Sequence, residues 1–296
     1  MKKFLSIIVA VLPALAAFGI QVLGAILFLI FYGIIYFLTT GISAINSGDG
    51  DVASSLEDFV NNVLLSTEVN YLGSALSIVL CGVVFYFWYR GITRNEAKVK
   101  LRSICTGKNI GLLVLLGLGS QFLISGLLSM ILPFMEDLLT DYAETMELLQ
   151  SGNTIVVVLL TVLIAPICEE LIFRGVILHN LNRQLPFLAA NLIQAALFGI
   201  YHMNIVQGVY AFLLGYVLGY VFYKFRTIVA PIALHMIVNS SAFLIELFPS
   251  YYFVFILFLV IGAIAMFVAI FFIQKTEAPI MVMKTKISSY GDFDDN

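Results

Sequence analysis

Eight long apolar stretches constrain this chain more than any other feature of its sequence. A helix needs about 20 apolar residues, at 1.5 Å each, to cross a hydrocarbon core of roughly 30 Å. Hydrophobic residues make up 61% of the chain and charged residues 11%, against roughly 25% charged in a soluble domain. We therefore predict an all-α, polytopic membrane protein with about eight transmembrane helices. The expected spans are residues 11–38, 71–89, 110–132, 154–178, 187–203, 206–223, 228–247 and 251–273.

The charges between these stretches orient the predicted bundle. With the N-terminus in the cytoplasm, all fifteen Lys and Arg residues fall on the cytoplasmic side, six of them in the loop 90–108. The long loops of the opposite side, 39–70 and 134–153, hold ten acidic residues and no Lys or Arg. Because this partition follows the positive-inside rule, we expect both termini in the cytoplasm. The protein is then an integral, multi-pass protein, and we expect it in a bacterial plasma membrane.

The same composition bears on partners and on domain organisation. A net charge of −3 and a pI of about 5.6 leave no basic face for phosphates, so we expect the lipid bilayer as a partner and no nucleic acid. We predict three regions: N-terminal membrane helices with a basic cytoplasmic loop (1–109), a membrane core (110–273) and a disordered cytoplasmic tail (274–296). The sequence leaves the oligomeric state open.

Few strongly polar residues lie within the apolar stretches, and these are the candidate site. A charge at the bilayer centre costs about 2.5–3.5 kcal/mol on insertion scales, so such residues are retained for a reason. They come from the fourth, fifth and seventh stretches. The set comprises Glu169, Glu170, Arg174, His202, His235 and Asn239.

Helical spacing predicts which of these groups meet. Glu170 and Arg174 are four residues apart, so they share a helix face and can form an ion pair. Glu169 is rotated by about 100° from Glu170 and can face elsewhere. His235 and Asn239 are also four apart and present an imidazole and an amide together. The inventory is one free carboxylate, one ion-paired carboxylate, two imidazoles and one amide.

This inventory fits a hydrolase that activates water. A carboxylate can act as the general base, and an imidazole and an amide can stabilise an oxyanion in a dry site. Glu169, His202 and His235 can also hold a zinc ion with a water in the fourth position. The His-Glu-x-x-His helix of many zinc proteases is absent. Both a zinc-dependent and a metal-free mechanism therefore stay open.

Three motifs in these stretches resemble those of the CPBP (Abi) family, which includes type II CAAX prenyl proteases. They are Glu169-Glu170-x-x-x-Arg174, Phe198-x-x-x-His202 and His235-x-x-x-Asn239, and the resemblance covers about residues 150–250. It implies a CPBP-like intramembrane protease core within 110–273. It further implies that Glu169 activates water with help from His202, that His235 and Asn239 form the oxyanion site, and that the Glu170–Arg174 pair orients Glu169. Phe198 would support the site by packing.

The predicted function is that of an intramembrane endopeptidase acting on a membrane-associated protein or peptide. A non-catalytic scaffold, such as an immunity or regulatory protein, and a proton-coupled transporter are the alternatives. The predicted site requires Glu169 and His202 to lie at a similar depth in the membrane. The linear topology places His202 near the outer end of its span and Glu169 towards the inner half of the fourth. The two reach a similar depth if the fourth helix continues as a long tilted helix to about Leu181.

Overall fold

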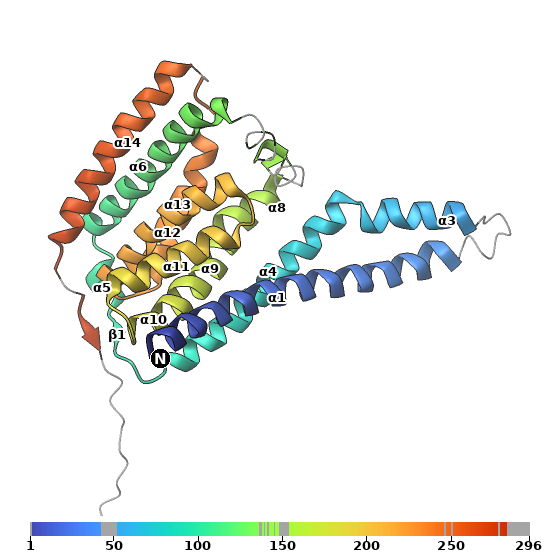
Figure 1. Cartoon of the computed structure of the whole chain (residues 1–296), viewed down its shortest axis with the longest axis horizontal. Helices are drawn as coiled ribbons and strands as arrows, with labels where there is room; N and C mark the ends of the chain where they lie inside the picture. The colour runs from blue at the N-terminus through green and yellow to red at the C-terminus, as the bar shows by residue number, and fades with distance from the viewer. Residues whose placement is uncertain are drawn as a thin grey trace, which may run out of the picture.

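The protein is an assembly of helices with one very small sheet (Figure 1). The computed structural model describes residues 2–42, 52–135, 138, 140, 142–144, 146–147, 154–245, 247–249, 251–277 and 279–282. The elements of the first half are α1 (Lys2–Tyr36), η1 (Phe37–Gly41), α3 (Val52–Phe59), η2 (Val60–Leu64), α4 (Thr67–Ile92), β1 (Lys98–Val99), α5 (Leu101–Ile104), α6 (Gly107–Ile131) and η3 (Leu132–Phe134). Those of the second half are α8 (Thr154–Val158), η4 (Leu159–Ile164), α9 (Ala165–Glu170), η5 (Leu171–Leu178), α10 (His179–Asn182), α11 (Phe187–Tyr201), α12 (Ile205–Phe225), α13 (Val229–Ile245), α14 (Tyr252–Gln274) and β2 (Met281–Val282).

The helices confirm an all-α, polytopic membrane protein. Within the described residues, six helices are long and apolar enough to cross a membrane. They are Val11–Thr40, Thr67–Ile92, Gly107–Ile131, Thr154–Asn182, Ile205–Phe225 and Tyr252–Gln274. Two shorter apolar helices, Phe187–Tyr201 and Val229–Ile245, accompany them. Each of the eight apolar stretches of the sequence therefore coincides with a helix.

The fourth stretch forms one uninterrupted helical rod from Thr154 to Asn182. It alternates α-helix with two π-helical segments, η4 and η5, which flank α9 on both sides. Wide π-turns of this kind occur frequently at functional sites. The rod continues past Leu181 to Asn182, which is the helix length that the predicted common depth of Glu169 and His202 requires.

The η5 part of the rod is packed among α1, α4, α11 and α12, whereas α8 lies at the edge of the bundle (Figure 1). α11 packs antiparallel to α12 beside the rod, and α14 packs along α6 on the far side of α13. All eight residues of η5 are buried, which places this segment at the centre of the core. The outward side chains of the bundle are largely aliphatic and aromatic, as expected where lipid takes the place of water.

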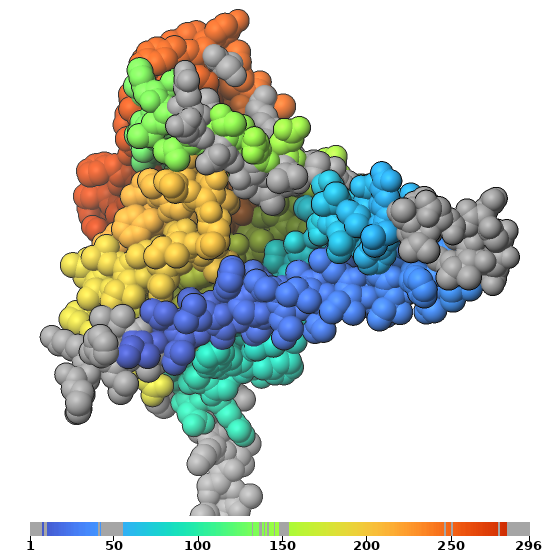
Figure 2. Space-filling model, turned by 45° about the vertical axis from the view of Figure 1, so that its right-hand side comes forward, coloured from blue at the N-terminus to red at the C-terminus, as the bar shows by residue number. Residues whose placement is uncertain are grey.

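The N-terminal helices leave the bundle as an arm. α1 runs alongside α4, and its far half lies beside α3 and η2 (Figures 1 and 2). The contact is tight, because a Cβ on Gly33 would lie 3.2 Å from the ring of Phe59. The Tyr36 and Phe59 rings meet edge to face with centroids 6.2 Å apart. The arm therefore contains packed helices.

The two short strands join distant parts of the chain at the end of the bundle that carries the basic loop. β1 pairs antiparallel with β2, with Lys98 opposite Val282 and Val99 opposite Met281. Part of the predicted tail, up to residue 282, thus contacts the basic loop. Residues 283–296 of that tail lie outside the described part of the chain, so its predicted disorder stays a prediction.

Candidate active site

The Glu170 carboxylate is the buried centre of the site. Its Oε1 accepts a hydrogen bond of 2.8 Å from Nη1 of Arg174, and both side chains are fully buried. This is the ion pair that the four-residue spacing predicts. The same oxygen lies 2.9 Å from Nδ1 of His235, on α13. Because a carboxylate oxygen accepts, Nδ1 donates this bond. The ion pair therefore holds His235, whereas the family resemblance implied that it orients Glu169.

Arg174 has a second anchor on another helix. Its Nη2 donates a 2.9 Å hydrogen bond to the backbone carbonyl of Gly215 on α12. A buried guanidinium is stabilised when acceptors meet its donors. The carboxylate of Glu170 and this carbonyl bind Nη1 and Nη2, which fixes the rod against α12, whereas the buried Nε makes no hydrogen bond with the described residues.

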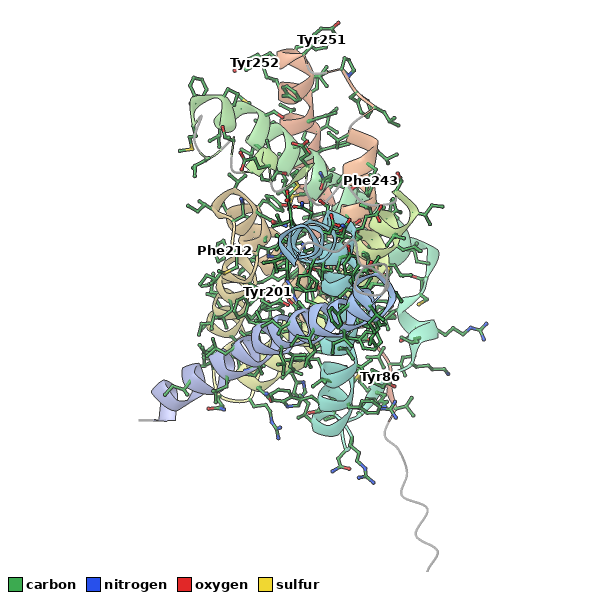
Figure 3. The ribbon with its side chains drawn as sticks, turned by 90° about the vertical axis from the view of Figure 1, so that its right-hand side faces the viewer. Tyr86, Tyr201, Phe212, Phe243, Tyr251 and Tyr252 are labelled. Carbon is green, nitrogen blue, oxygen red and sulfur yellow. The ribbon has the colours of Figure 1, made fainter. Side chains whose placement is uncertain are left out.

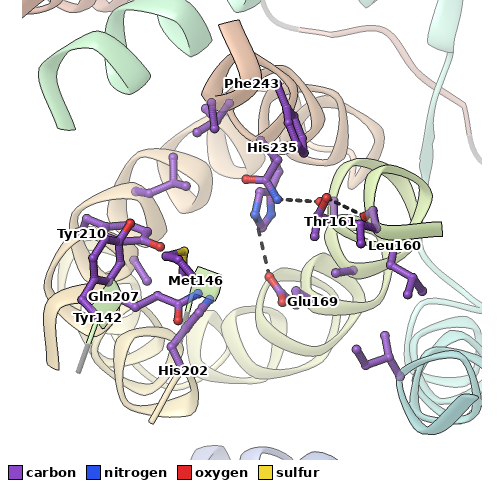
Figure 4. Close-up of a pocket in the computed structure, with 18 of the residues that line it drawn as sticks. Tyr142, Met146, Leu160, Thr161, Glu169, His202, Gln207, Tyr210, His235 and Phe243 are labelled. Atoms are coloured by element: carbon purple, nitrogen blue, oxygen red, sulfur yellow. Dashed lines mark hydrogen bonds and ion pairs between the residues drawn. The ribbon is translucent and has the colours of Figure 1, made fainter. Parts of the chain in front are cut away.

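Glu169, unlike Glu170, lines a cavity. Its side chain is 19% exposed, and its Oε2 lies 3.8 Å from Nε2 of His235. The two groups point towards each other in Figure 4. A separation of 3.8 Å is longer than a hydrogen bond, and a polar contact of that length leaves room for bridging through water. His235 therefore lies between two glutamates, with one nitrogen towards each.

His202 lies across the cavity, at the end of α11, close to Tyr142, Gln207 and Tyr210 (Figure 4). Its Nδ1 is 2.8 Å from the carbonyl oxygen of Phe198. A carbonyl only accepts, so Nδ1 carries the proton in this bond and Nε2 of a neutral ring is left as an acceptor.

Asn239 contributes an amide to the same cavity. Its Nδ2 donates a 2.8 Å hydrogen bond to the carbonyl of Thr161, which lies in the π-helical segment η4. An amide NH₂ carries two donors, so one hydrogen remains after this bond. The bond also ties α13 to the rod next to the candidate site.

Phe198 is the packing centre beneath these groups. Its ring is almost fully buried and meets the rings of His202 and His235 edge to face, with centroids 4.8 and 5.9 Å away. The guanidinium carbon of Arg174 lies 4.7 Å from its centroid, a favourable cation–π distance. One aromatic side chain thus contacts all three helices of the site.

Sequence reasoning missed a polar network one layer behind Arg174. Gln194 donates 2.9 Å and 2.7 Å hydrogen bonds to the carbonyl of Gly215 and to Oδ1 of Asn191. Asn191 in turn donates to the carbonyl of Tyr216 at 2.9 Å. Both amides are fully buried. The available signal was a pair of amide residues three apart in an apolar stretch, which puts them on one helix face.

The cavity has a volume of about 730 Å³, within the range of roughly 300–1,000 Å³ typical of binding pockets. Four of the predicted site residues line it together with Phe198. They are Glu169, His202, His235 and Asn239. Glu170 and Arg174 lie behind this wall. The structure therefore gathers all the predicted residues but divides them into a cavity-lining set and a buried set.

The metal-ligand set considered from the sequence is not assembled in this geometry. Within the described part of the chain, no three His, Cys, Asp or Glu side chains are grouped so that they could hold one ion. Nδ1 of His235 is bound to Glu170, and Nδ1 of His202 is bound to a carbonyl. The described side chains as placed therefore do not form a shared zinc site.

The fold and this site define a class: a helical membrane protein with a paired-glutamate and histidine site inside its bundle. Residues 151–241 match the family model described as "Type II CAAX prenyl endopeptidase Rce1-like". A Bacillus subtilis (strain 168) protein named "Putative membrane peptidase YdiL" is 25% identical over 182 residues, which are 60% of this chain and 72% of that protein. No solved structure matches the chain. These matches support the resemblance of residues 151–241 to the CAAX-protease-like membrane proteins of the CPBP family.

Proposed function

We propose that this protein is an intramembrane endopeptidase that hydrolyses a peptide bond of a membrane-associated protein or peptide. The observation that supports this most is that two adjacent glutamates differ in burial and in their contacts. Glu170 is fully buried, and its Oε1 contacts both Arg174 and His235, whereas Glu169 is partly exposed in the cavity. A structural ion-pair network needs only the first of these carboxylates. The second is free to do chemistry.

In the proposed mechanism, Glu169 takes a proton from a water molecule while the water oxygen bonds to the peptide carbonyl carbon. Nε2 of His202 accepts a hydrogen bond from the same water. The resulting oxyanion accepts hydrogen bonds from the second amide hydrogen of Asn239 and from His235 when its Nε2 is protonated. The proton on Glu169 then passes to the leaving nitrogen as the carbon–nitrogen bond breaks. General acid–base catalysis of this kind contributes roughly 10²–10⁴-fold to the rate.

The test compares purified wild type with Glu169→Gln and His235→Ala on a library of quenched-fluorescent peptides in detergent. Cleavage by wild type and its loss in both variants, with thermal unfolding unchanged for Glu169→Gln, is the expected result. Glu68→Gln is the matched control, because Glu68 is an exposed glutamate in the first turn of α4 and its loss leaves the site intact. Equal cleavage by wild type and Glu169→Gln would refute the assigned base. Absence of cleavage by every form would favour the non-catalytic scaffold.

A further inference from the structure

The two ends of the bundle differ in charge. One end of the bundle is basic. The C-terminal ends of α4, α10 and α12 lie together there and carry Arg90, Arg183 and the Lys224–Arg226 segment. This end also holds β1 and α5 (Figure 1). Acidic side chains that the structure describes at the other end include Glu68, in the first turn of α4. By the positive-inside rule the basic end faces the cytoplasm. The other end then faces the outside of the cell.

The cavity belongs to the second of these ends. Six helices line it, and each contributes the part of its length that lies nearest to the acidic loops. Helices that run inwards contribute residues near their beginning, and helices that run outwards contribute residues near their end. The lining ranges are 67–78 of α4, 121–128 of α6, 157–169 of the Thr154–Asn182 rod, Phe198 and the capping His202 of α11, 207–214 of α12 and 235–243 of α13.

Aromatic residues also indicate that the cavity lies towards the outer end of the bundle. Tyr251 and Tyr252 lie at one extreme of the molecule and Tyr86 lies towards the other (Figure 3). Phe243, which lines the cavity, lies nearer to the Tyr251 end in that view. Tyrosines are enriched where a helix enters the headgroup region. The cavity therefore extends from mid-bundle towards the outer interface.

Two described residues of the predicted outer loop 134–153 take part in the cavity wall. These residues, Tyr142 and Met146, line the cavity beside Tyr210 of α12 (Figure 4). Burial raises the pKa of the Tyr142 hydroxyl, and a hydrogen bond with Tyr210 partly offsets this. The hydroxyl thus stays protonated at neutral pH and remains a donor at the outer rim.

The cytoplasmic half below the site is filled by side chains. Phe173, Ile177 and Leu178 of η5 have no exposed surface. Arg174 closes the same layer through its bonds to Glu170 and Gly215. A segment of a substrate in the cytoplasm would have to displace this packed layer to reach Glu169. A segment on the outer side meets the cavity first.

We infer that the site is reached from the extracytoplasmic face, so that its substrates are exported or membrane-anchored peptides whose scissile segment lies outside the cytoplasm. That the site has a substrate rests on the proposed function. The side from which the site is reached rests on the residues that line the cavity. It distinguishes this chain's substrates from a prenylated C-terminus presented in the cytoplasm.

One test follows the direction of access without any activity. Cys105 is exposed in the basic loop, whereas Cys81 and Cys168 are buried, so Cys105 is a reporter of the cytoplasmic side. In a Cys105→Ser chain, Ser74→Cys and Ser125→Cys each place one reactive thiol in the cavity wall. Intact cells are treated with a membrane-impermeant maleimide before and after permeabilisation. The two cavity thiols should be labelled before permeabilisation, and Cys105 of the wild type only after it.

The second test follows cleavage in oriented membranes. The quenched-fluorescent peptides cleaved in detergent are added to right-side-out and to inverted vesicles. Cleavage by right-side-out vesicles, with loss of cleavage in inverted vesicles until detergent is added, is expected. The reverse pattern, or cavity thiols that react only after permeabilisation or not at all, would overturn the inference. Failure of cleavage in detergent would count against the proposed function alone, because the labelling test is independent of it.

Discussion

His235 and Glu170 are joined by a buried hydrogen bond of 2.9 Å between Nδ1 and Oε1. The same carboxylate oxygen accepts from Arg174 at 2.8 Å. A partner on one ring nitrogen fixes both the orientation of an imidazole and the nitrogen that carries its proton. Glu170 is therefore a positioning residue for His235, and the other nitrogen of the ring is presented to Glu169 and the cavity.

Glu170→Gln should destabilise the protein strongly. Glutamine keeps the size of the side chain but removes the charge that balances Arg174, and an uncompensated buried charge costs about 3–5 kcal/mol. We expect a clearly lower midpoint of thermal unfolding in detergent. Glu57→Gln, on the exposed face of α3, is the control and should unfold like wild type. An unchanged midpoint for Glu170→Gln would show that the ion pair is dispensable.

Glu169→Gln, in contrast to Glu170→Gln, should lower the activity of the protein and leave its stability nearly unchanged. The side chain is partly exposed and its Oε2 lies 3.8 Å from Nε2 of His235, so little stability depends on it. Loss of the general base should lower kcat by about 100-fold or more. Thermal unfolding and turnover are measured on the same preparations. A variant that loses both stability and activity would place Glu169 among the structural residues.

The helices and the ion pair could be predicted because both depend on local sequence. Apolar length determines a membrane helix, and a spacing of four residues brings Glu170 to Arg174. Every apolar stretch of the sequence accordingly corresponds to a helix of the structure. The depth of Glu169 relative to His202 could be stated only as a condition, because the length of the fourth helix depends on packing.

The partner of Glu170 could not be predicted in this way. His235 lies 65 residues further along the chain, and no periodicity tells which of two adjacent carboxylates on the rod it meets. The π-helical turns beside α9 shift the register of the rod and help decide it. The Asn191–Gln194 network was missed for a related reason, since its acceptors are backbone carbonyls of α12, which sequence does not mark.

A metal chelator should leave the cleavage rate unchanged. Within the part of the chain that the structure describes, no three ligand side chains converge, and the proposed mechanism uses the chain's own residues. The rate of peptide cleavage is measured with the purified protein before and after incubation with 1,10-phenanthroline, followed by dialysis. A zinc protease treated in parallel shows that the chelator is active. Loss of cleavage that returns on adding zinc would contradict the arrangement of His202, His235 and Glu169 described above.

Gly262→Ala should loosen the packing of α14 against α6. A Cβ at this position would meet the backbone nitrogen of Leu123 and would lie 2.8 Å from the carbonyl oxygen of Gly119. Backbone atoms of a packed helix cannot move aside as a side chain can, and overpacking costs typically about 1–3 kcal/mol. The matched control is Gly111→Ala on α6, where nothing lies within 4 Å of the added carbon. Because alanine favours helix over glycine by about 0.8–1 kcal/mol, the control should unfold at the wild-type temperature or above it, and Gly262→Ala below it. Equal unfolding midpoints for the two variants in detergent would show that α14 and α6 can move apart at this contact without loss of stability.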